Sequence, residues 1–185
     1  MKILITGANG FIGTHLCNEL SNRNVKFRAT ARSANENNYA DFVRCDLETT
    51  ESLNQLIDGC DMVVHLAGRA HVTSDDSQEK YQVANEFVTQ RLANAAAQNG
   101  IARFVYLSSI KVNSESSSPG LPIRQSDAPN PLDNYGRSKL AAELALQEIC
   151  RANNMDYVII RPTLVYGKGV KANFSALISA VKRGL

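Results

Sequence analysis

The opening thirteen residues constrain the fold more than any other stretch of the chain. Residues 3–5 form an apolar run without alternation, which is typical of a strand buried on both faces of a parallel sheet. A glycine-rich turn follows at once. Beyond it, Ile12, Leu16 and Leu20 recur at a spacing of four and predict an amphipathic helix. The chain therefore begins as a buried strand, a tight turn and a helix.

The turn contains Gly7, Gly10 and Gly13 in the pattern GxxGxxG. Gly7 permits the tight turn, Gly10 lets a diphosphate approach the backbone, and Gly13 lets the helix pack closely on the sheet. Unpaired N–H groups at the start of the helix favour an anion there. A glycine turn that binds nothing is the alternative, but the strand before it and the helix after it favour dinucleotide binding. The turn residues expected to join the glycines in holding the dinucleotide are Asn9, Phe11 and Ile12.

Composition narrows the class of protein. The chain has 185 residues, 44% of them hydrophobic and 21% charged, which suits one globular domain, residues 1–185. The net charge of +2 and the lack of a long basic run give no reason to expect nucleic acid, and no apolar stretch has the ~18 residues of a membrane span. The scattered cysteines and histidines show no metal-ligand spacing and indicate free thiols, so we expect a cytoplasmic protein without a metal.

The remaining pattern alternates strands with helices. Such alternation favours a Rossmann-like α/β fold, with a doubly wound parallel sheet and right-handed crossovers. Polar residues 35–39 and the Ser-, Pro- and Gly-rich residues 112–132 are predicted loops. Further strands are expected at 25–30, 41–45, 61–66, 102–107 and 157–161, and further helices at 49–57, 79–99, 134–153 and 174–181.

The end of the second predicted strand bears on the choice of cofactor. A dinucleotide-binding unit usually carries a carboxylate here for the adenosine ribose, but this chain has Arg32 between Ala31 and Ser33. A guanidinium can pair with a 2′-phosphate, which favours NADP. Alternatively, Arg32 stacks beside adenine or is simply solvated. The cofactor is therefore expected to be NAD or NADP.

Polar groups suited to chemistry follow later in the chain. Ser108 and Ser109 come after the fifth predicted strand, and ligands bind outside the carboxyl ends of parallel strands. Tyr135 and Lys139 are four residues apart and share one helix face. An ammonium near a phenol lowers its pKa from about 10, which allows proton transfer near neutral pH. His65 is interpreted as a packed core residue.

Together these motifs resemble the extended short-chain dehydrogenase/reductase family, in its NAD-dependent epimerase/dehydratase branch. The resemblance rests on the order of the glycine turn, Asp46-Leu47, the HLAG turn at 65–68, Ser108-Ser109 and the YxxxK pair. It implies that Ser109 is the catalytic serine, with Ser108 as runner-up. It also implies that Tyr135 is the general base or acid, and that Lys139 lowers the tyrosine pKa and binds the nicotinamide ribose.

The resemblance implies further contacts with the cofactor and substrate. Asp46 and Leu47 would contact adenine, although Asp46 also suits a helix cap. Asn173 would contact the substrate diphosphate, and Asn85 would bond backbone near the fourth strand. The remaining residues implied to lie against the cofactor are Leu66, Ala67, Gly68, Pro162 and Thr163.

The function implied by the resemblance is hydride transfer at C4 of a UDP-hexose, as in UDP-glucose or UDP-N-acetylglucosamine 4-epimerases. A UDP-4-keto-hexose reductase and a non-catalytic NAD(P)-binding regulatory module are the alternatives. A dehydratase is disfavoured because Ile110 and Lys111 follow Ser109, where acidic residues are expected. Family members pair helices like those at 79–99 and 134–153 in homodimers. They also continue into a smaller substrate domain, so we expect this chain to be the cofactor-binding part of a longer protein.

Overall fold

The structure, a computed structural model, describes residues 1–34, 38–70, 76–117, 121–170 and 181–183. All pairings between its long strands are parallel, and they form one six-stranded sheet in the order β3-β2-β1-β4-β5-β6. This order confirms the predicted Rossmann-like, doubly wound sheet. The strands are β1 (Ile3–Thr6), β2 (Phe27–Ala31), β3 (Phe42–Arg44), β4 (Met62–His65), β5 (Arg103–Leu107) and β6 (Asp156–Ile160).

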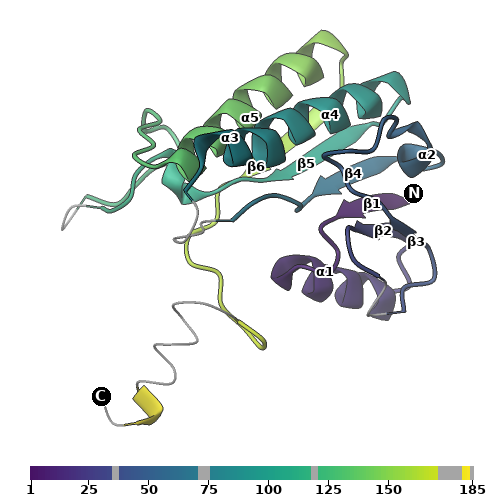
Figure 1. Ribbon diagram of the computed structural model, residues 1–185, viewed down its shortest axis with the longest axis horizontal. Helices are drawn as coiled ribbons and strands as arrows, with labels where there is room; N and C mark the ends of the chain where they lie inside the picture. The colour runs from purple at the N-terminus through teal and green to yellow at the C-terminus, as the bar shows by residue number, and fades with distance from the viewer. Residues whose placement is uncertain (35–37, 71–75, 118–120, 171–180, 184–185) are drawn as a thin grey trace.

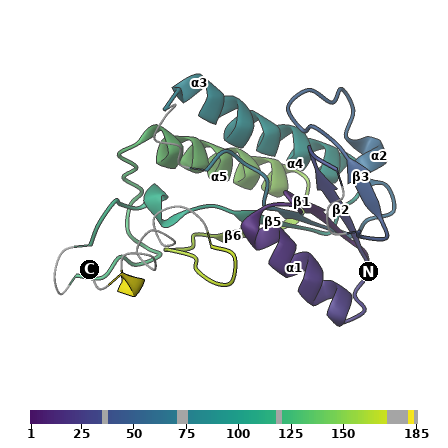
Figure 2. The ribbon, with the colours of Figure 1, turned by 60° about the horizontal axis from the view of Figure 1, so that its bottom comes forward.

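Helices cover the two faces of the sheet. Helix α1 lies on one face, while the long helices α4 and α5 lie side by side on the other (Figure 1). The turned view in Figure 2 shows the same three layers, with α1 alone on its side. The helices are α1 (Phe11–Asn22), α2 (Asn54–Ile57), α3 (Gln78–Tyr81), the π-helical turn η1 (Gln82–Phe87), α4 (Val88–Gln98), the 3-10 turn η2 (Ile110–Val112) and α5 (Asn134–Ala152).

The central strand β1 is buried along its whole length because it has a neighbour on each side and helices above and below. Its last residue, Thr6, pairs with Thr30 of β2 and with His65 of β4. The chain winds outward from β1 in both directions, so the strand order reverses between β1 and β4. In open α/β sheets, ligands bind outside the carboxyl ends of the strands at this reversal.

Each face of the sheet has its own apolar core. On the side of α1, Ile3, Ile5 and Cys17 pack with Ala29. On the other side, Leu4, Val63 and Phe104 pack against Leu92 of α4 and Leu146 of α5. Alternate residues of β1 therefore enter opposite cores, which explains its unbroken apolar sequence.

Two predicted helices differ from the structure. The helix predicted at 49–57 is reduced to Asn54–Ile57, because residues 46–50 form a turn in which Asp46 Oδ1 accepts from Glu48 N at 3.0 Å. The helix predicted at 79–99 is interrupted by the π-helical turn η1, whose only buried residue is Asn85. Periodicity cannot reveal such a turn, since it inserts one residue into an otherwise helical pattern.

The edge strand β6 is more exposed than the central strands. Val158 and Ile160 keep 43% and 45% of their surface exposed on the side of α1. Beyond β6, the carbonyl of Lys168 lies 2.9 Å from His15 Nε2, so this segment passes beside α1. The helix predicted at 174–181 lies outside the described residues except for Val181. Within the described part of the chain, no helix has the length and apolarity to cross a bilayer.

Candidate active site

A cavity of about 830 Å³ opens at the carboxyl ends of β1, β2 and β4. It lies where the strand order reverses, as predicted for a doubly wound sheet. The predicted cofactor residues that line it are Gly7, Asn9, Gly10, Arg32, Asp46, Leu47, Leu66, Ala67 and Gly68.

The glycine turn closes one wall of this cavity. Gly7 has φ +70°, and a Cβ there would lie 2.7 Å from the backbone nitrogen of Ala67, so the turn can approach the end of β4 only without a side chain. A Cβ on Gly13 would lie 2.1 Å from the carbonyl oxygen of Gly7, so α1 packs tightly on this turn. Helix α1 therefore starts directly at the cavity, with Gly10 as its N-cap.

Two buried polar atoms on the cavity wall suit a polar ligand. Among the described residues, Asn9 Oδ1 and Thr30 Oγ1 are buried without a hydrogen-bond partner, and both residues line the cavity. Buried polar atoms normally have partners. The amide of Asn9 is already fixed, since its Nδ2 donates to Ser33 Oγ and to the carbonyl of Ala34, each at 2.8 Å. The turn, the helix start and these atoms fit a dinucleotide.

The part of the cavity wall after β2 and β3, where the adenosine of a dinucleotide is expected and which we call the adenosine end, carries charges of both signs. Arg32 is largely exposed, and its Nη1 lies 3.6 Å from Glu48 Oε1. Arg44 Nε donates to the carbonyl of Arg32 at 2.9 Å. No carboxylate stands at the end of β2, but Glu48 in the loop after β3 brings one into the same wall.

The loop that bears Asp46, Leu47 and Glu48 is held from helix α4. The guanidinium of Arg91 donates to the carbonyls of Leu47 at 2.9 Å and Glu48 at 3.0 Å, and also contacts the carbonyl of Thr50. A planar group with several donors can satisfy several carbonyls of one loop. Arg91 was not predicted as part of the site, because nothing in the sequence connects it with residues 46–50.

The predicted catalytic residues meet at the end of β5 and the start of α5. Ser109 caps η2, with its Oγ accepting from the backbone nitrogen of Lys111 at 3.2 Å. Tyr135 lies in the first turn of α5, and its ring centroid is 6.0 Å from that of Tyr81. The Ser109 side chain also lies close enough to Tyr135 to act on the pKa of its phenol. The serine and the tyrosine are therefore brought together, although neither lines the described cavity wall.

Lys139 connects this corner with the cavity. Its residue is only 5% exposed, and its Nζ donates to the carbonyl of Leu107 at 3.0 Å while lying 4.7 Å from the ring centroid of Tyr106. The same Nζ is 3.3 Å from the point that a Cβ on Gly68 would occupy. Because Gly68 lines the cavity, the ammonium lies at its rim. Burial lowers the pKa of Lys139 to about 8, although Glu143 acts to raise it.

The sequence predicts that Lys139 lowers the pKa of Tyr135, but Lys139 is not among the groups that act on this pKa in the structure. The pKa of Tyr135 is raised, above all because burial penalises the phenolate. The hydroxyl of Ser109 and the ammonium of Lys111 act to lower this pKa, whereas Asp133 and Tyr81 act to raise it. The Lys139 ammonium donates to the Leu107 carbonyl and lies over the Tyr106 ring.

The neighbouring serine has a different environment. Ser108 is 3% exposed, and its Oγ donates to the buried carboxylate of Glu143. Arg161, which follows β6, donates to the same carboxylate from Nε at 2.9 Å and to Asn113 Oδ1 at 3.1 Å. This network joins α5 to the ends of β5 and β6. It occupies Ser108 and leaves Ser109 beside Tyr135.

A second network behind the site contains Asn85. Its Oδ1 accepts from the backbone nitrogen of Arg69 at 2.8 Å, and its Nδ2 donates to the carbonyl of Arg69 at 3.1 Å and to Ser138 Oγ at 2.9 Å. Ser138 Oγ in turn donates to the carbonyl of Tyr135 at 2.8 Å. The predicted contact of Asn85 with backbone after the fourth strand is present. It also reaches the helix that carries the tyrosine.

Several residues considered in the sequence lie elsewhere. His65 is completely buried and accepts or donates at Nδ1 with Thr6 Oγ1 at 2.7 Å, as expected of a core residue. Phe11 packs edge-on against His15, and the carbonyl of Pro162 accepts from Ile110 N at 3.0 Å. Neither Ile12 nor the exposed Thr163 lines the cavity, and Asn173 lies outside the described residues.

Sequence reasoning missed about half of the cavity wall. Some of these residues adjoin predicted ones and were within reach of the motifs, namely Thr30, Ala31, Ser33, Cys45, Glu48 and Arg69. Others come from α3, η1 and the start of α4, and only the approach of these helices in space brings them to the cavity. They are Glu79, Lys80, Val83, Ala84 and Val88.

Comparison with known proteins agrees with this geometry. Residues 3–185 match the model of the NAD dependent epimerase/dehydratase family. The chain is 38% identical to a UDP-glucose 4-epimerase of Vibrio cholerae, over 100% of this chain and 58% of that protein. It is 30% identical to a UDP-2-acetamido-2,6-beta-L-arabino-hexul-4-ose reductase of Pseudomonas aeruginosa, over 97% of this chain and 40% of that protein.

A solved structure resembles the whole of this chain. MoeE5 in complex with UDP-glucose and NAD superimposes with a TM-score of 0.87 at 33% identity, over 100% of this chain and 62% of that one. The chain thus spans about three fifths or less of the proteins it matches. Since the family match, the sheet order and the glycine turn all agree, the chain belongs to the NAD dependent epimerase/dehydratase family, within the short-chain dehydrogenase/reductase type.

Proposed function

We propose that the full-length protein is an NAD-dependent enzyme that acts at C4 of a UDP-hexose, as UDP-glucose and UDP-N-acetylglucosamine 4-epimerases do. The observation that carries this proposal is a cavity walled by the glycine turn, with Lys139 beside Gly68 of its wall and with Ser109 close to Tyr135 at the start of α5. The relatives named for UDP-sugar chemistry support the choice of substrate class. Bound in this cavity, NAD would accept a hydride from the sugar and return it.

The residues of this chain would divide the work. Tyr135 would take the proton from the C4 hydroxyl, and Ser109 would hydrogen-bond the same oxygen. Lys139, at the rim beside Gly68, would hold the ribose next to the nicotinamide. Pro162 and Thr163 would lie beside the nicotinamide, and Asn173 would contact the substrate diphosphate, as the family resemblance implies.

The choice between NAD and NADP depends on the adenosine end. The guanidinium of Arg32 would bind a 2′-phosphate. The carboxylate of Glu48 on the same wall would repel this phosphate and would suit a ribose hydroxyl. A solved neighbour that contains NAD supports NAD. We therefore propose NAD as the main cofactor, with NADP as the alternative that Arg32 favours.

A reductase is the second candidate. It would start from a 4-keto sugar, and Tyr135 would then donate its proton to the keto oxygen. The P. aeruginosa relative named as a hexul-4-ose reductase supports this direction. A regulatory module that binds NAD(P) without chemistry fits less well, because the chain retains Ser109, Tyr135 and Lys139 together.

We also propose a homodimer and a cytoplasmic location. Phe87 and Leu144 are 42% and 58% exposed on η1 and α5, and they suit a homodimer through these helices. The four cysteines are free, which suits the reducing cytoplasm.

Turnover by the full-length protein tests the proposal. We expect it to convert UDP-glucose or UDP-N-acetylglucosamine to the C4 epimer, detected by NMR of the sugar. The Tyr135→Phe variant should lose about a hundredfold or more in kcat, since general acid–base catalysis contributes about 10²–10⁴. Reduction of a UDP-4-keto-hexose without epimerisation would select the second candidate. Unchanged turnover in Tyr135→Phe would contradict the assigned role.

A further inference from the structure

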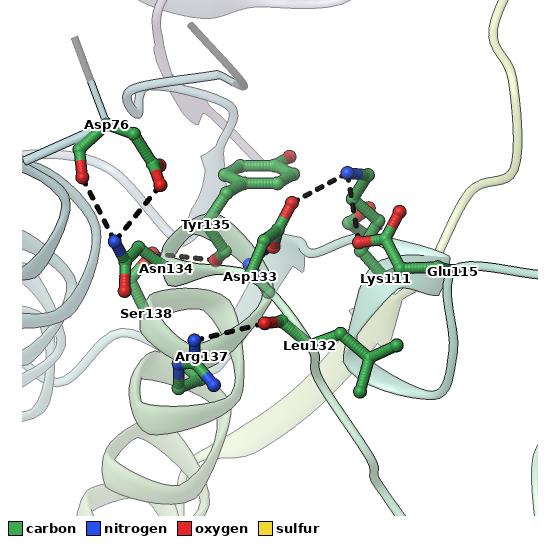
Figure 3. A network of polar contacts seen from close by, with 11 residues as sticks. Asp76, Lys111, Glu115, Leu132, Asp133, Asn134, Tyr135, Arg137 and Ser138 are labelled. Carbon is green, nitrogen blue, oxygen red and sulfur yellow. Dashed lines mark hydrogen bonds and ion pairs between the residues drawn. The ribbon is translucent and has the colours of Figure 1, made fainter. Parts of the chain in front are cut away.

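A charged cluster lies next to the proposed catalytic tyrosine. Lys111 Nζ is 2.6 Å from Asp133 Oδ2 and 3.1 Å from Glu115 Oε1. Asp133 is also the N-cap of α5, since its Oδ1 accepts from the backbone nitrogen of Gly136 at 2.6 Å. One carboxylate therefore caps the helix with one oxygen and holds an ammonium with the other (Figure 3).

The cluster is tied to both sides of the catalytic corner. Lys111 is two residues beyond Ser109, whose Oγ accepts from the backbone nitrogen of Lys111 at 3.2 Å. Asp133 is two residues before Tyr135. Figure 3 shows the Tyr135 ring beside the pair of Asp133 and Lys111, with Glu115 on the far side of the ammonium.

Two other charged groups near Tyr135 are hydrogen-bonded to other partners. The Lys139 ammonium is directed to the Leu107 carbonyl. Asp76 accepts from Asn134 Nδ2 at 3.2 Å. Among the described residues, Lys111 and Asp133 are the two opposite charges that act on Tyr135.

We propose that Lys111 is a positioning residue of the catalytic corner, an ammonium held by Asp133 and Glu115 that stabilises the phenolate form of Tyr135. This inference rests on the proposed function, in which Tyr135 exchanges a proton with the sugar. Asp133 has the opposite electrostatic effect, because its carboxylate disfavours a second negative charge nearby. The balance of the two charges sets how readily Tyr135 ionises.

Lys111 is suited to this role because it stays charged. Burial acts against its ammonium, but the bonds to Asp133 and Glu115 outweigh burial and raise the pKa of Lys111 above its usual value. The cation is therefore present throughout the pH range in which Tyr135 would work. At the same time, the two carboxylates hold the ammonium in one place, whereas a lysine without partners would move freely.

An electrostatic role of Lys111 and Asp133 and a purely structural ion pair predict different results. A structural pair predicts that loss of either partner loosens the corner and changes the Tyr135 pKa in one direction. An electrostatic role predicts that the Tyr135 pKa shifts in opposite directions in the two variants. Lys111→Met removes the positive charge and should raise the Tyr135 pKa. Asp133→Asn removes the negative charge but keeps an oxygen for Gly136 N, so it should lower the pKa.

The experiment is a pH titration of the Tyr135 phenol by NMR, in protein labelled with carbon-13 at tyrosine Cζ. The Tyr135→Phe variant identifies the signal, and the other tyrosine signals report whether each variant is folded. We expect shifts of about 0.5–1 pKa unit, upward in Lys111→Met and downward in Asp133→Asn. The double variant should return close to the original value, and Lys111→Arg should keep it.

Glu115→Gln is the matched control, since it removes a carboxylate from Lys111 that has no resolved effect on Tyr135. The Tyr135 pKa shift in Glu115→Gln should be smaller than the shift in Lys111→Met or in Asp133→Asn. Shifts of the same sign in Lys111→Met and Asp133→Asn, or no shift in Asp133→Asn, would overturn the proposal. If Lys111→Met does not fold, the sign in Asp133→Asn and the retention in Lys111→Arg decide.

This readout needs no turnover and so separates two failures. Absence of UDP-hexose turnover with opposite pKa shifts would reject the proposed function and leave the electrostatic role of Lys111 standing. Turnover without opposite shifts would do the reverse.

Discussion

Lys139 keeps a positive charge where burial opposes it. It is 5% exposed, and its resolved contacts are one carbonyl and one aromatic face. Burial lowers its pKa to about 8, against the pull of Glu143 in the other direction. A buried charge of this kind costs stability, and such costs are concentrated at functional sites. The residue is therefore better explained by chemistry than by packing.

Replacing this lysine should stabilise the fold while removing activity. In Lys139→Met, we expect the free energy of unfolding at pH 7 to rise by about 2 kcal/mol, because a buried ammonium is replaced by an apolar chain of similar length. The native protein should gain stability as pH rises from about 8, where folded Lys139 loses its proton, towards the unfolded value near 10.5. The variant should lack this gain.

Urea unfolding at several pH values checks this expectation, with exposed Lys26→Met as the control that should change little. A Lys139→Met variant that is less stable than the native protein at pH 7 would show that the lysine contributes to folding instead.

At the scale of the element, the helical run α3–η1–α4 does more than cover the sheet. Asn85, the buried residue of η1, bonds both backbone groups of Arg69 and reaches Ser138 in α5. Arg91, six residues later in α4, donates to the carbonyls of Leu47 and Glu48. A π-helical turn at such a position is frequent near functional sites. This run therefore positions the loops after β3 and β4.

Loss of Asn85 should weaken both the fold and the site. Asn85→Ala leaves the backbone N–H of Arg69 without its buried partner, so we expect a loss of about 1–3 kcal/mol in the free energy of unfolding. Asn94→Ala is the matched control in the same run, because Asn94 is exposed and bonds only the Gln90 carbonyl within its own helix. The midpoints of denaturant unfolding measure the stability of both variants, provided that the dependence of the unfolding free energy on denaturant concentration is unchanged. Equal effects of the two variants would refute the special role of Asn85.

At the scale of the whole molecule, much of the fold was predictable because each strand carries its own evidence. The unbroken apolar run of β1 reflects burial on both faces, and the alternation with helices leaves few topologies. The motifs at the ends of β1, β3 and β4 line one cavity, because parallel strands have their carboxyl ends at the same edge of the sheet. The family resemblance already favoured Ser109 over Ser108, and the structure adds a physical reason, because Ser108 is bound to Glu143.

The rest of the site could not be predicted because it depends on contacts between distant segments. Glu48 approaches Arg32 through the turn at Asp46, a residue that the sequence suggested as an adenine contact or a helix cap. In the sequence, Lys111 is notable only as a basic residue where a dehydratase would have an acidic one. Its bond to Asp133 joins residues that a loop separates, and it alters the electrostatics of Tyr135.

The most direct test of the account is the identity of the nucleotide released when the purified full-length protein is denatured, measured by chromatography and mass spectrometry and completed by calorimetric titration of NAD and NADP. The account predicts NAD or NADH in near-equimolar amount, or tight binding of added NAD if the cofactor is lost on purification. Recovery of NADP instead would favour the interpretation of Arg32 as a 2′-phosphate ligand. The absence of any dinucleotide, with no binding of either one on titration, would contradict the claim that the glycine turn and its cavity hold a nicotinamide cofactor.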